Sequence, residues 1–227
     1  MLMETVKERV FALREELKTG NPFGEQVALV AATKMQGVEA INAAILAGVD
    51  AVAENKVQEF REKTELLLPC PQHFIGHLQT NKVKYLVGKI SLFHSCDRFD
   101  LANEIARISV QRGVVSDVLL QVNIGEEITK GGFLPNEARA AYERLLTVEG
   151  LRLKGLMAML PDTDDKETLV RLADEMRSLF EWAKSVDSHA EYLSMGMSGD
   201  YRLCIERGSN MIRVGSTIFG ARDYGNK

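Results

Sequence analysis

The chain has 227 residues, 45 % of them hydrophobic, and a formal net charge of −4 at neutral pH. This length and apolar content are typical of one globular domain with a full hydrophobic core. No long basic stripe supports a nucleic-acid partner, and no apolar run reaches the roughly 18 residues that a membrane-spanning helix requires. We therefore expect a soluble protein that binds neither nucleic acid nor membrane.

The N-terminus and the cysteines indicate where such a protein works. Residues 3–10 carry charges of both signs and lack the apolar core of a signal peptide. Cys70, Cys96 and Cys204 lie far apart, which argues against a disulfide framework or a zinc site. Both observations favour a reducing, cytoplasmic compartment.

Apolar spacing alternates between helix and strand along the chain. Residues 3–18 have a helical period that ends at Gly20, and residues 27–33 form a continuous apolar run, as in a buried parallel strand, that ends at Lys34. The pattern then repeats. Further helices are predicted over 38–47, 56–68, 81–87, 99–112, 136–146, 169–186 and 200–206, and further strands over 50–54, 73–76, 90–95, 117–123, 153–159, 191–194 and 211–214. Asp97 and Asn136 are expected to cap two of the helices.

Strict alternation of strands and helices implies parallel strands. An open doubly wound sheet usually stops at five to seven strands, whereas eight units without spare length suggest a closed (β/α)₈ TIM barrel. We predict one such barrel as a single domain over residues 1–227, with an extra N-terminal helix.

The C-terminal ends of barrel strands carry the working groups of this fold. The residues placed there are Lys34, Glu54, Asn55, Gly76, His77, Ser95, Asn123, Met157, Ser198, Gly199, Gly215 and Ser216. The last four form two small-residue turns before helices, where backbone N–H groups can approach an anion closely. They predict a phosphate cradle, with Arg213 as a fixed positive charge between the turns.

Lys34 supplies the chemistry opposite this cradle. Closure of the barrel places the first strand beside the seventh and eighth, and a lysine at the rim of an apolar mouth is a candidate nucleophile. A phosphorylated aldehyde could rest its phosphate on the turns and form a Schiff base with Lys34. Pyridoxal phosphate (PLP) is the obvious candidate, and a lysine Schiff base with an arginine near the pyridine nitrogen is one of its known settings.

Seven motifs in order resemble the pyridoxal phosphate homeostasis protein family. They are Ala31-Ala-Thr-Lys34, Ala53-Glu-Asn-Lys-Val-Gln-Glu59, His73-Phe-Ile-Gly-His-Leu-Gln-Thr-Asn-Lys82, Val122-Asn-Ile before Lys130-Gly-Gly, Lys154-Gly-Leu-Met-Ala-Met159, Leu193-Ser-Met-Gly-Met-Ser198 and Ile212-Arg-Val-Gly-Ser-Thr-Ile-Phe-Gly-Ala-Arg222. The resemblance implies the barrel of the alanine racemase N-terminal domain and a role in vitamin B6 homeostasis without established turnover. It implies that Lys34 holds PLP as an internal aldimine, that Asn55 lines the pocket and that Arg213 meets the pyridine nitrogen. Ser198, Gly199, Gly215 and Ser216 would hold the phosphate.

The chain departs from the family pattern at three places. Thr33 stands where serine is common and Ser216 where threonine is, and both keep a hydroxyl. Lys130 is followed directly by two glycines, which leaves a secondary cofactor contact of that loop open.

Each candidate also has a structural interpretation. Arg213 could pair with an acid such as Glu54, Asn55 could cap the helix that begins at Lys56, and His77 could be structural. Four methionines could fill the barrel core: Met157, Met159, Met195 and Met197. The charges of Glu54, Lys56 and Glu59 could form a solvated helix face.

Three functions remain open: a PLP carrier, a PLP-dependent amino-acid racemase, and a phosphate-binding barrel unrelated to PLP. Arginine cannot supply the proton that makes the pyridine ring a strong electron sink. In alanine racemase the second base comes from another domain of the partner subunit, and we see no counterpart of that domain in this sequence. The carrier is the favoured prediction, a monomer with PLP-dependent apo-enzymes as recipients.

Overall fold

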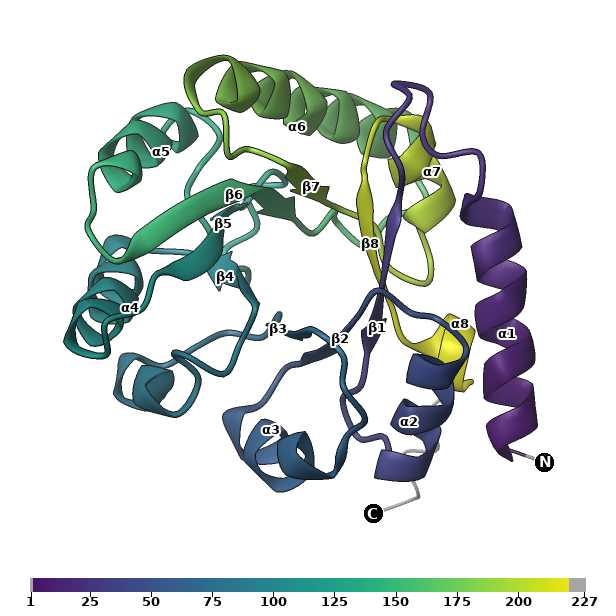
Figure 1. The fold of residues 1–227 in the computed structure, drawn as a ribbon. Helices are drawn as coiled ribbons and strands as arrows, with labels where there is room; N and C mark the ends of the chain where they lie inside the picture. The colour runs from purple at the N-terminus through teal and green to yellow at the C-terminus, as the bar shows by residue number, and fades with distance from the viewer. Residues whose placement is uncertain (1, 221–227) are drawn as a thin grey trace.

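The computed structural model describes residues 2–220, so Arg222 at the end of the last motif lies outside the described residues. Eight parallel strands form a closed barrel in the order β1 to β8, and β8 pairs with β1. Figure 1 shows the strands gathered at the centre with the helices around them. The predicted (β/α)₈ barrel is confirmed.

The elements follow the predicted alternation. The strands are β1 (Ala28–Ala32), β2 (Ala51–Glu54), β3 (Gln72–Phe74), β4 (Leu92–Cys96), β5 (Ser116–Val122), β6 (Leu151–Ala158), β7 (Tyr192–Ser194) and β8 (Met211–Val214). The α-helices are α1 (Leu2–Leu17), α2 (Val38–Leu46), α3 (Val57–Lys63), α4 (Phe99–Gln111), α5 (Ala138–Leu146), α6 (Lys166–Val186), α7 (Tyr201–Glu206) and α8 (Ser216–Phe219). Two 3₁₀-helices are η1 (Thr64–Leu66) and η2 (Thr80–Tyr85).

Helix type and capping differ locally from the predictions. The segment expected as a helix over 81–87 is the 3₁₀-helix η2, and the helix expected over 56–68 ends at Lys63 and continues as η1. Neither Asp97 nor Asn136 caps a helix, because α4 follows Arg98 and α5 follows Glu137 without a side-chain cap. Asp97 instead accepts hydrogen bonds from the neighbouring Arg98 and from His77.

The barrel interior is a packed core rather than a pore. Its buried residues are Val30, Ala51, Ala53, Leu92, Leu119, Met157 and Met211. Among the four methionines assigned to the core, Met157 is buried in this interior, and Met195 is buried in the core that packs the strands against the surrounding helices. Interior packing therefore closes the barrel below its C-terminal mouth.

The predicted extra N-terminal helix α1 lies on the outside of the barrel, beside α2 and α8 (Figure 1). Arg9 donates to the carbonyl of Ile218 in α8 at 3.2 Å. Arg14 pairs with Asp50, whose other oxygen accepts the Leu29 amide. The helix thus fastens the first and last units where the barrel closes.

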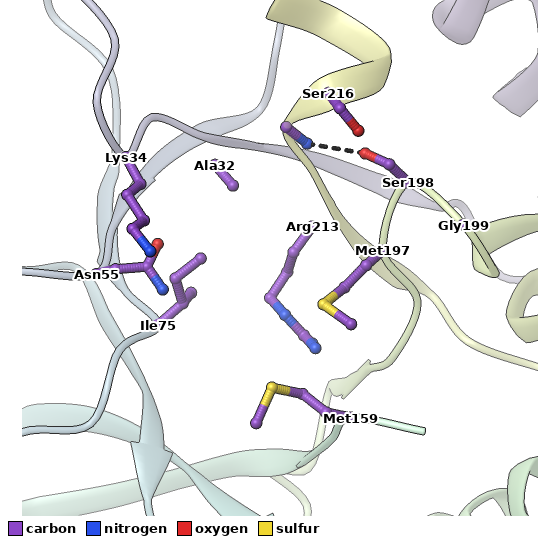
Figure 2. Close-up of a pocket in the computed structure, with 11 residues that line it drawn as sticks. Ala32, Lys34, Asn55, Ile75, Met159, Met197, Ser198, Gly199, Arg213 and Ser216 are labelled. Carbon is purple, nitrogen blue, oxygen red and sulfur yellow. Dashed lines mark hydrogen bonds between the residues drawn. The ribbon is translucent and has the colours of Figure 1, made fainter. Parts of the chain in front are cut away.

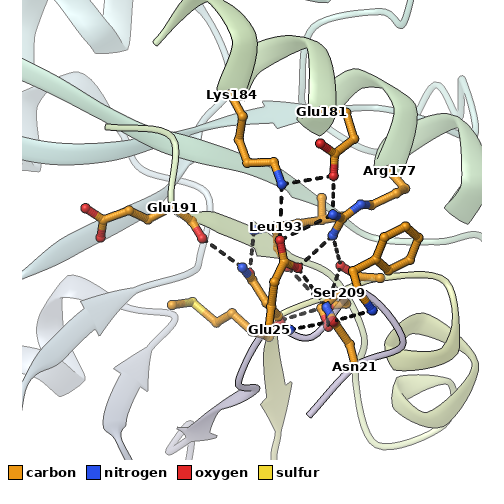
Figure 3. A network of polar contacts seen from close by, with 12 residues as sticks. Asn21, Glu25, Arg177, Glu181, Lys184, Glu191, Leu193 and Ser209 are labelled. Atoms are coloured by element: carbon orange, nitrogen blue, oxygen red, sulfur yellow. Dashed lines mark hydrogen bonds and ion pairs between the residues drawn. The ribbon is translucent and has the colours of Figure 1, made fainter. Parts of the chain in front are cut away.

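A polar network closes the opposite, N-terminal end of the barrel (Figure 3). The Arg177 guanidinium of α6 binds Glu25 at 2.7 Å and the carbonyl of Gly208 at 2.9 Å. Asn21 donates to Glu25 and to the same carbonyl. The network joins the loop before β1, helix α6 and the turn before β8.

Within residues 2–220, the structure contains no helix with the length and apolar character needed to cross a membrane.

Candidate functional site

A cavity of about 480 Å³ lies at the mouth of the barrel, beyond the C-terminal ends of β1, β2, β7 and β8 (Figure 2). It is lined by Ala32, Lys34, Asn55, Ile75, Met159, Met197, Ser198, Gly199, Arg213, Gly215 and Ser216. All seven residues predicted to bind a cofactor line this one cavity.

The two small-residue turns meet on one side of the cavity. The Ser198 hydroxyl, which follows β7, accepts hydrogen bonds from the backbone amides of Gly215 at 3.2 Å and Thr217 at 3.3 Å. Both amides lie at the start of α8, directly after β8. The turn after β7 and the turn after β8 therefore meet at one oxygen atom, the Ser198 hydroxyl. The same donors suit an anionic oxygen, such as one of a phosphate group.

Lys34 lies across the cavity from these turns, two residues after β1 (Figure 2). Among the described residues, no hydrogen bond or ion pair involves its amine. The next residue, Met35, has φ +63°, a left-handed conformation that is uncommon for a residue with a side chain. The chain therefore turns sharply where it presents the lysine.

Arg213 extends from β8 into the cavity between the two sides (Figure 2). Its guanidinium donates to the Ser194 carbonyl at 2.8 Å, the Ser194 hydroxyl at 2.6 Å and the Ala158 carbonyl at 3.0 Å. All three acceptors are uncharged, and burial lowers the pKa of Arg213 to about 10. The arginine is still charged at neutral pH, and the proposed ion pair with Glu54 is wrong.

Two buried histidines support Arg213 from within the barrel. His94 Nδ1 lies 3.0 Å from the Ser194 hydroxyl, and His94 Nε2 lies 3.0 Å from His73 Nδ1. Burial lowers the pKa of His73 to about 4 and that of His94 well below its ordinary value, so both rings are neutral near pH 7. Because Arg213 can only donate, the Ser194 hydroxyl accepts from Arg213 and donates its own hydrogen bond to His94 Nδ1. His94 then donates from Nε2 to His73.

Of the three charged residues assigned to a solvated helix face, two lie instead in a largely buried ion-pair network. Glu54 and Glu59 both bind the Lys63 ammonium at 2.8 Å, and their side chains are only 8 % and 17 % exposed. Burial lowers the pKa of Lys63, but the hydrogen bonds to the two carboxylates outweigh it and hold the pKa above its ordinary value. Lys56 alone is exposed as the solvated-face interpretation expects.

Several other expected rim residues lie away from the cavity. His77 is exposed and pairs with Asp97, whereas Ser95 is buried and donates to the Gly76 carbonyl. Asn123 binds carbonyls of the loop that follows β5. Asn55 does not cap α3, because the residue at that position is Lys56.

Four residues of the cavity wall were not predicted as site residues from the sequence: Ala32, Ile75, Met159 and Met197. Met159 and Met197 had been assigned to the barrel core, but they follow the ends of β6 and β7 and face the cavity (Figure 2). The available signal was position along the chain: Met159 is the last residue of the strand predicted over 153–159, and Met197 lies three residues beyond the strand predicted over 191–194. These apolar side chains suit the faces of an aromatic ring.

The arrangement can hold a phosphorylated, electrophilic aromatic molecule. The turns offer amide donors, Lys34 offers an amine that no described residue engages, and the apolar wall lies between them. The chemistry of these donors fits PLP.

Comparison with known proteins points the same way. Residues 10–223 match the family model of the alanine racemase N-terminal domain. The pyridoxal phosphate homeostasis protein of Aquifex aeolicus is 40 % identical over 205 residues, 88 % of this chain and 90 % of its own. That of Pasteurella multocida is 38 % identical over 87 % of this chain and 88 % of its own.

Solved structures give the same fold. PipY of Synechococcus elongatus with PLP bound has a TM-score of 0.83 at 30 % identity and covers 95 % of this chain and 100 % of its own. The structure of PipY without PLP has a TM-score of 0.86 at 31 % identity, with coverage of 95 % and 100 %. Alanine racemase of Clostridium difficile has a TM-score of 0.83 at 18 % identity and covers 96 % of this chain and 57 % of its own, a likeness of fold alone.

Proposed function

Because the chain belongs to the family of pyridoxal phosphate homeostasis proteins, we propose that it binds PLP and takes part in intracellular vitamin B6 homeostasis. One observation carries the proposal: the amine of Lys34, the converging amides of the two turns and the guanidinium of Arg213 line a single cavity. PLP supplies an aldehyde that forms a Schiff base with a lysine.

Each part of the cavity has a role in this proposal. Lys34 carries the cofactor as an aldimine, and Asn55 lines the pocket beside it. Four residues of the two turns hold the phosphate: Ser198, Gly199, Gly215 and Ser216. Arg213 donates to the pyridine nitrogen, held in place by Ser194 and the Ala158 carbonyl.

We propose further that the protein does not turn over amino acids. Among the described residues that line the cavity, only Lys34 and Arg213 are ionisable. No described carboxylate contacts Arg213, so the pyridine nitrogen meets a donor that keeps its own proton. One lysine can remove or return a proton on one face only, whereas racemisation requires both faces.

The wider role is part of the same proposal. Residues 1–227 would act as one PLP-binding domain, as a monomer that delivers the cofactor to PLP-dependent apo-enzymes. Three free cysteines, two of them buried, are compatible with the reducing cytoplasm.

The test is reconstitution with PLP followed by borohydride reduction and peptide mass spectrometry. We expect a visible Schiff-base absorbance, a pyridoxyl group on Lys34 after reduction, and loss of both in Lys34→Ala. Lys56→Ala, which removes an exposed lysine nearby, is the matched control and should keep both signals. A pyridoxyl group on another lysine of the unmodified protein would contradict the assignment.

The same preparation tests the absence of turnover. Incubated with L-alanine in deuterated water, it should release very little D-alanine. Racemisation at about 1–1,000 per second, the range typical of enzymes, would establish the racemase alternative instead.

A further inference from the structure

We propose that Lys63 is a positioning residue for Lys34: through two largely buried carboxylates it fixes the backbone on both sides of that lysine. The inference rests on the proposed function, in which Lys34 is the point of cofactor attachment. Lys63 belongs to the end of α3 and does not line the cavity, so its contribution would pass through the chain that carries Lys34.

On the N-terminal side, Lys63 holds Thr33. Its ammonium lies 3.2 Å from the Thr33 carbonyl, the peptide oxygen directly before Lys34, and 2.8 Å from Glu54 Oε1. The Thr33 hydroxyl, itself buried, lies 2.6 Å from the same Glu54 oxygen. The end of β1 is thereby tied to the end of β2 and to α3.

On the C-terminal side, Lys63 acts through Glu59. The ammonium lies 2.8 Å from Glu59 Oε2, and the same oxygen accepts the backbone amide of Met35 at 2.8 Å. Met35 is the residue in the left-handed conformation, so the hydrogen bond stabilises the turn that follows Lys34. Thr33 is thus bound to Lys63 and Glu54, and Met35 to Glu59. These three charged side chains are joined through Lys63, and we call them the clamp.

The charges of the clamp make Lys63 its central member. One ammonium faces two carboxylates, its three N–H groups meet three oxygen acceptors, and its side chain is 13 % exposed. Glu54 Oε2 is buried and has no hydrogen-bond partner in the part of the chain that the structure describes, so Glu54 depends on the contacts of its other oxygen. Removal of Lys63 would leave two poorly solvated carboxylates side by side, and at least one would move or take up water.

The consequence for the site is geometric. The clamp fixes the backbone around Lys34, whose amine has no partner within residues 2–220. The amine can therefore move only by rotation of its own side chain about a fixed backbone. An attacking group that is misplaced by about 1 Å can lose up to a hundredfold in rate. A clamp without Lys63 should therefore slow bond formation with the aldehyde more than it weakens binding of phosphate and ring.

The experiment separates these two effects in the apo-protein. For Lys63→Met, we expect Schiff-base formation with PLP, followed by stopped-flow absorbance, to be about tenfold slower or more. The affinity for pyridoxine 5′-phosphate, which has the phosphate and ring but no aldehyde, should change less than about twofold, since the turns and Arg213 are untouched. Amide hydrogen exchange at Met35 should become faster even without ligand.

Two further variants make the outcome specific. Lys154→Met is the matched control, because Lys154 is equally buried (12 % exposed) and pairs with Glu191, and it should change the Schiff-base rate less than about twofold. Glu59→Gln keeps an oxygen acceptor for the Met35 amide and should stay closer to the unmodified rate than Glu59→Ala.

The positioning role would be overturned if Lys63→Met formed the Schiff base at the rate of the unmodified protein. It would also be overturned if the affinity for pyridoxine 5′-phosphate fell by the same factor as the rate. Failure of the proposed function looks different, since Lys34→Ala would then form the same Schiff base as the unmodified protein.

Discussion

Gly76 shows how a single residue without a side chain shapes the cavity. It follows β3, and a Cβ atom added there would lie 2.0 Å from the carbonyl oxygen of Asn55. Asn55 lines the cavity, and only glycine at position 76 allows the segments after β2 and β3 to approach this closely.

Gly76→Ala should therefore displace Asn55. We expect a loss of about 1–3 kcal/mol in the free energy of unfolding, the usual range for overpacking, together with weaker PLP binding. Denaturant unfolding and a PLP titration measure the two effects. The control is Gly125→Ala, whose added Cβ would meet only side-chain atoms, at 3.5 Å and beyond; an equal effect of both substitutions would rule out the specific approach to Asn55.

At the scale of elements, the two ends of the barrel have separate tasks. The C-terminal mouth carries the cavity, whereas the opposite end is closed by the network of Arg177, Glu25 and Asn21. Arg177 has a side chain only 7 % exposed and joins α6 to the loop before β1 and the turn before β8. This network stabilises the closure of the barrel without touching the site.

Arg177→Met should accordingly lower stability but not cofactor affinity. We expect a loss of about 2–4 kcal/mol in the free energy of unfolding, because Glu25 and the Gly208 carbonyl lose a buried charged donor. Lys184→Met removes a more exposed partner of Glu25 and should cost about 0–1 kcal/mol. Denaturant unfolding with and without PLP measures both effects, and a large fall in PLP affinity for Arg177→Met would contradict the separation of tasks.

For the whole molecule, the buried histidines make stability depend on pH. In the unfolded chain a histidine takes up its proton near pH 6.5, whereas folded His73 does so only at about pH 4. Because the folded pKa is lower than the unfolded pKa, the free energy of unfolding is highest above pH 6.5 and decreases as the pH falls toward the folded pKa. His94 acts in the same direction.

We expect the free energy of unfolding to fall between pH 6.5 and pH 4.8 by about 2 kcal/mol from His73 alone. Denaturant unfolding at several pH values measures this slope. His73→Gln should flatten it. An unchanged slope in His73→Gln would mean that other groups cause the pH dependence.

The sequence by itself determined the barrel and most of the proposed site. Eight alternating strands and helices leave few ways to bury every apolar face, and the seven predicted cofactor residues stand at or just beyond strand ends. Because parallel strands present their C-terminal ends at one mouth, their positions along the chain were enough to bring Lys34, Arg213 and both turns together.

Only the tertiary structure decided which side chains meet across the fold. Whether Met159 faces the cavity or the core depends on side-chain orientation at the strand end, where a shift of one residue reverses the face. Glu54 pairs with Lys63 rather than Arg213, and Ser194 meets a histidine 100 residues away, because strand pairing and helix packing set these neighbours. The local pattern of apolar and charged residues predicts helices and strands. It does not predict the partner of a buried charge, because that partner comes from a distant part of the chain.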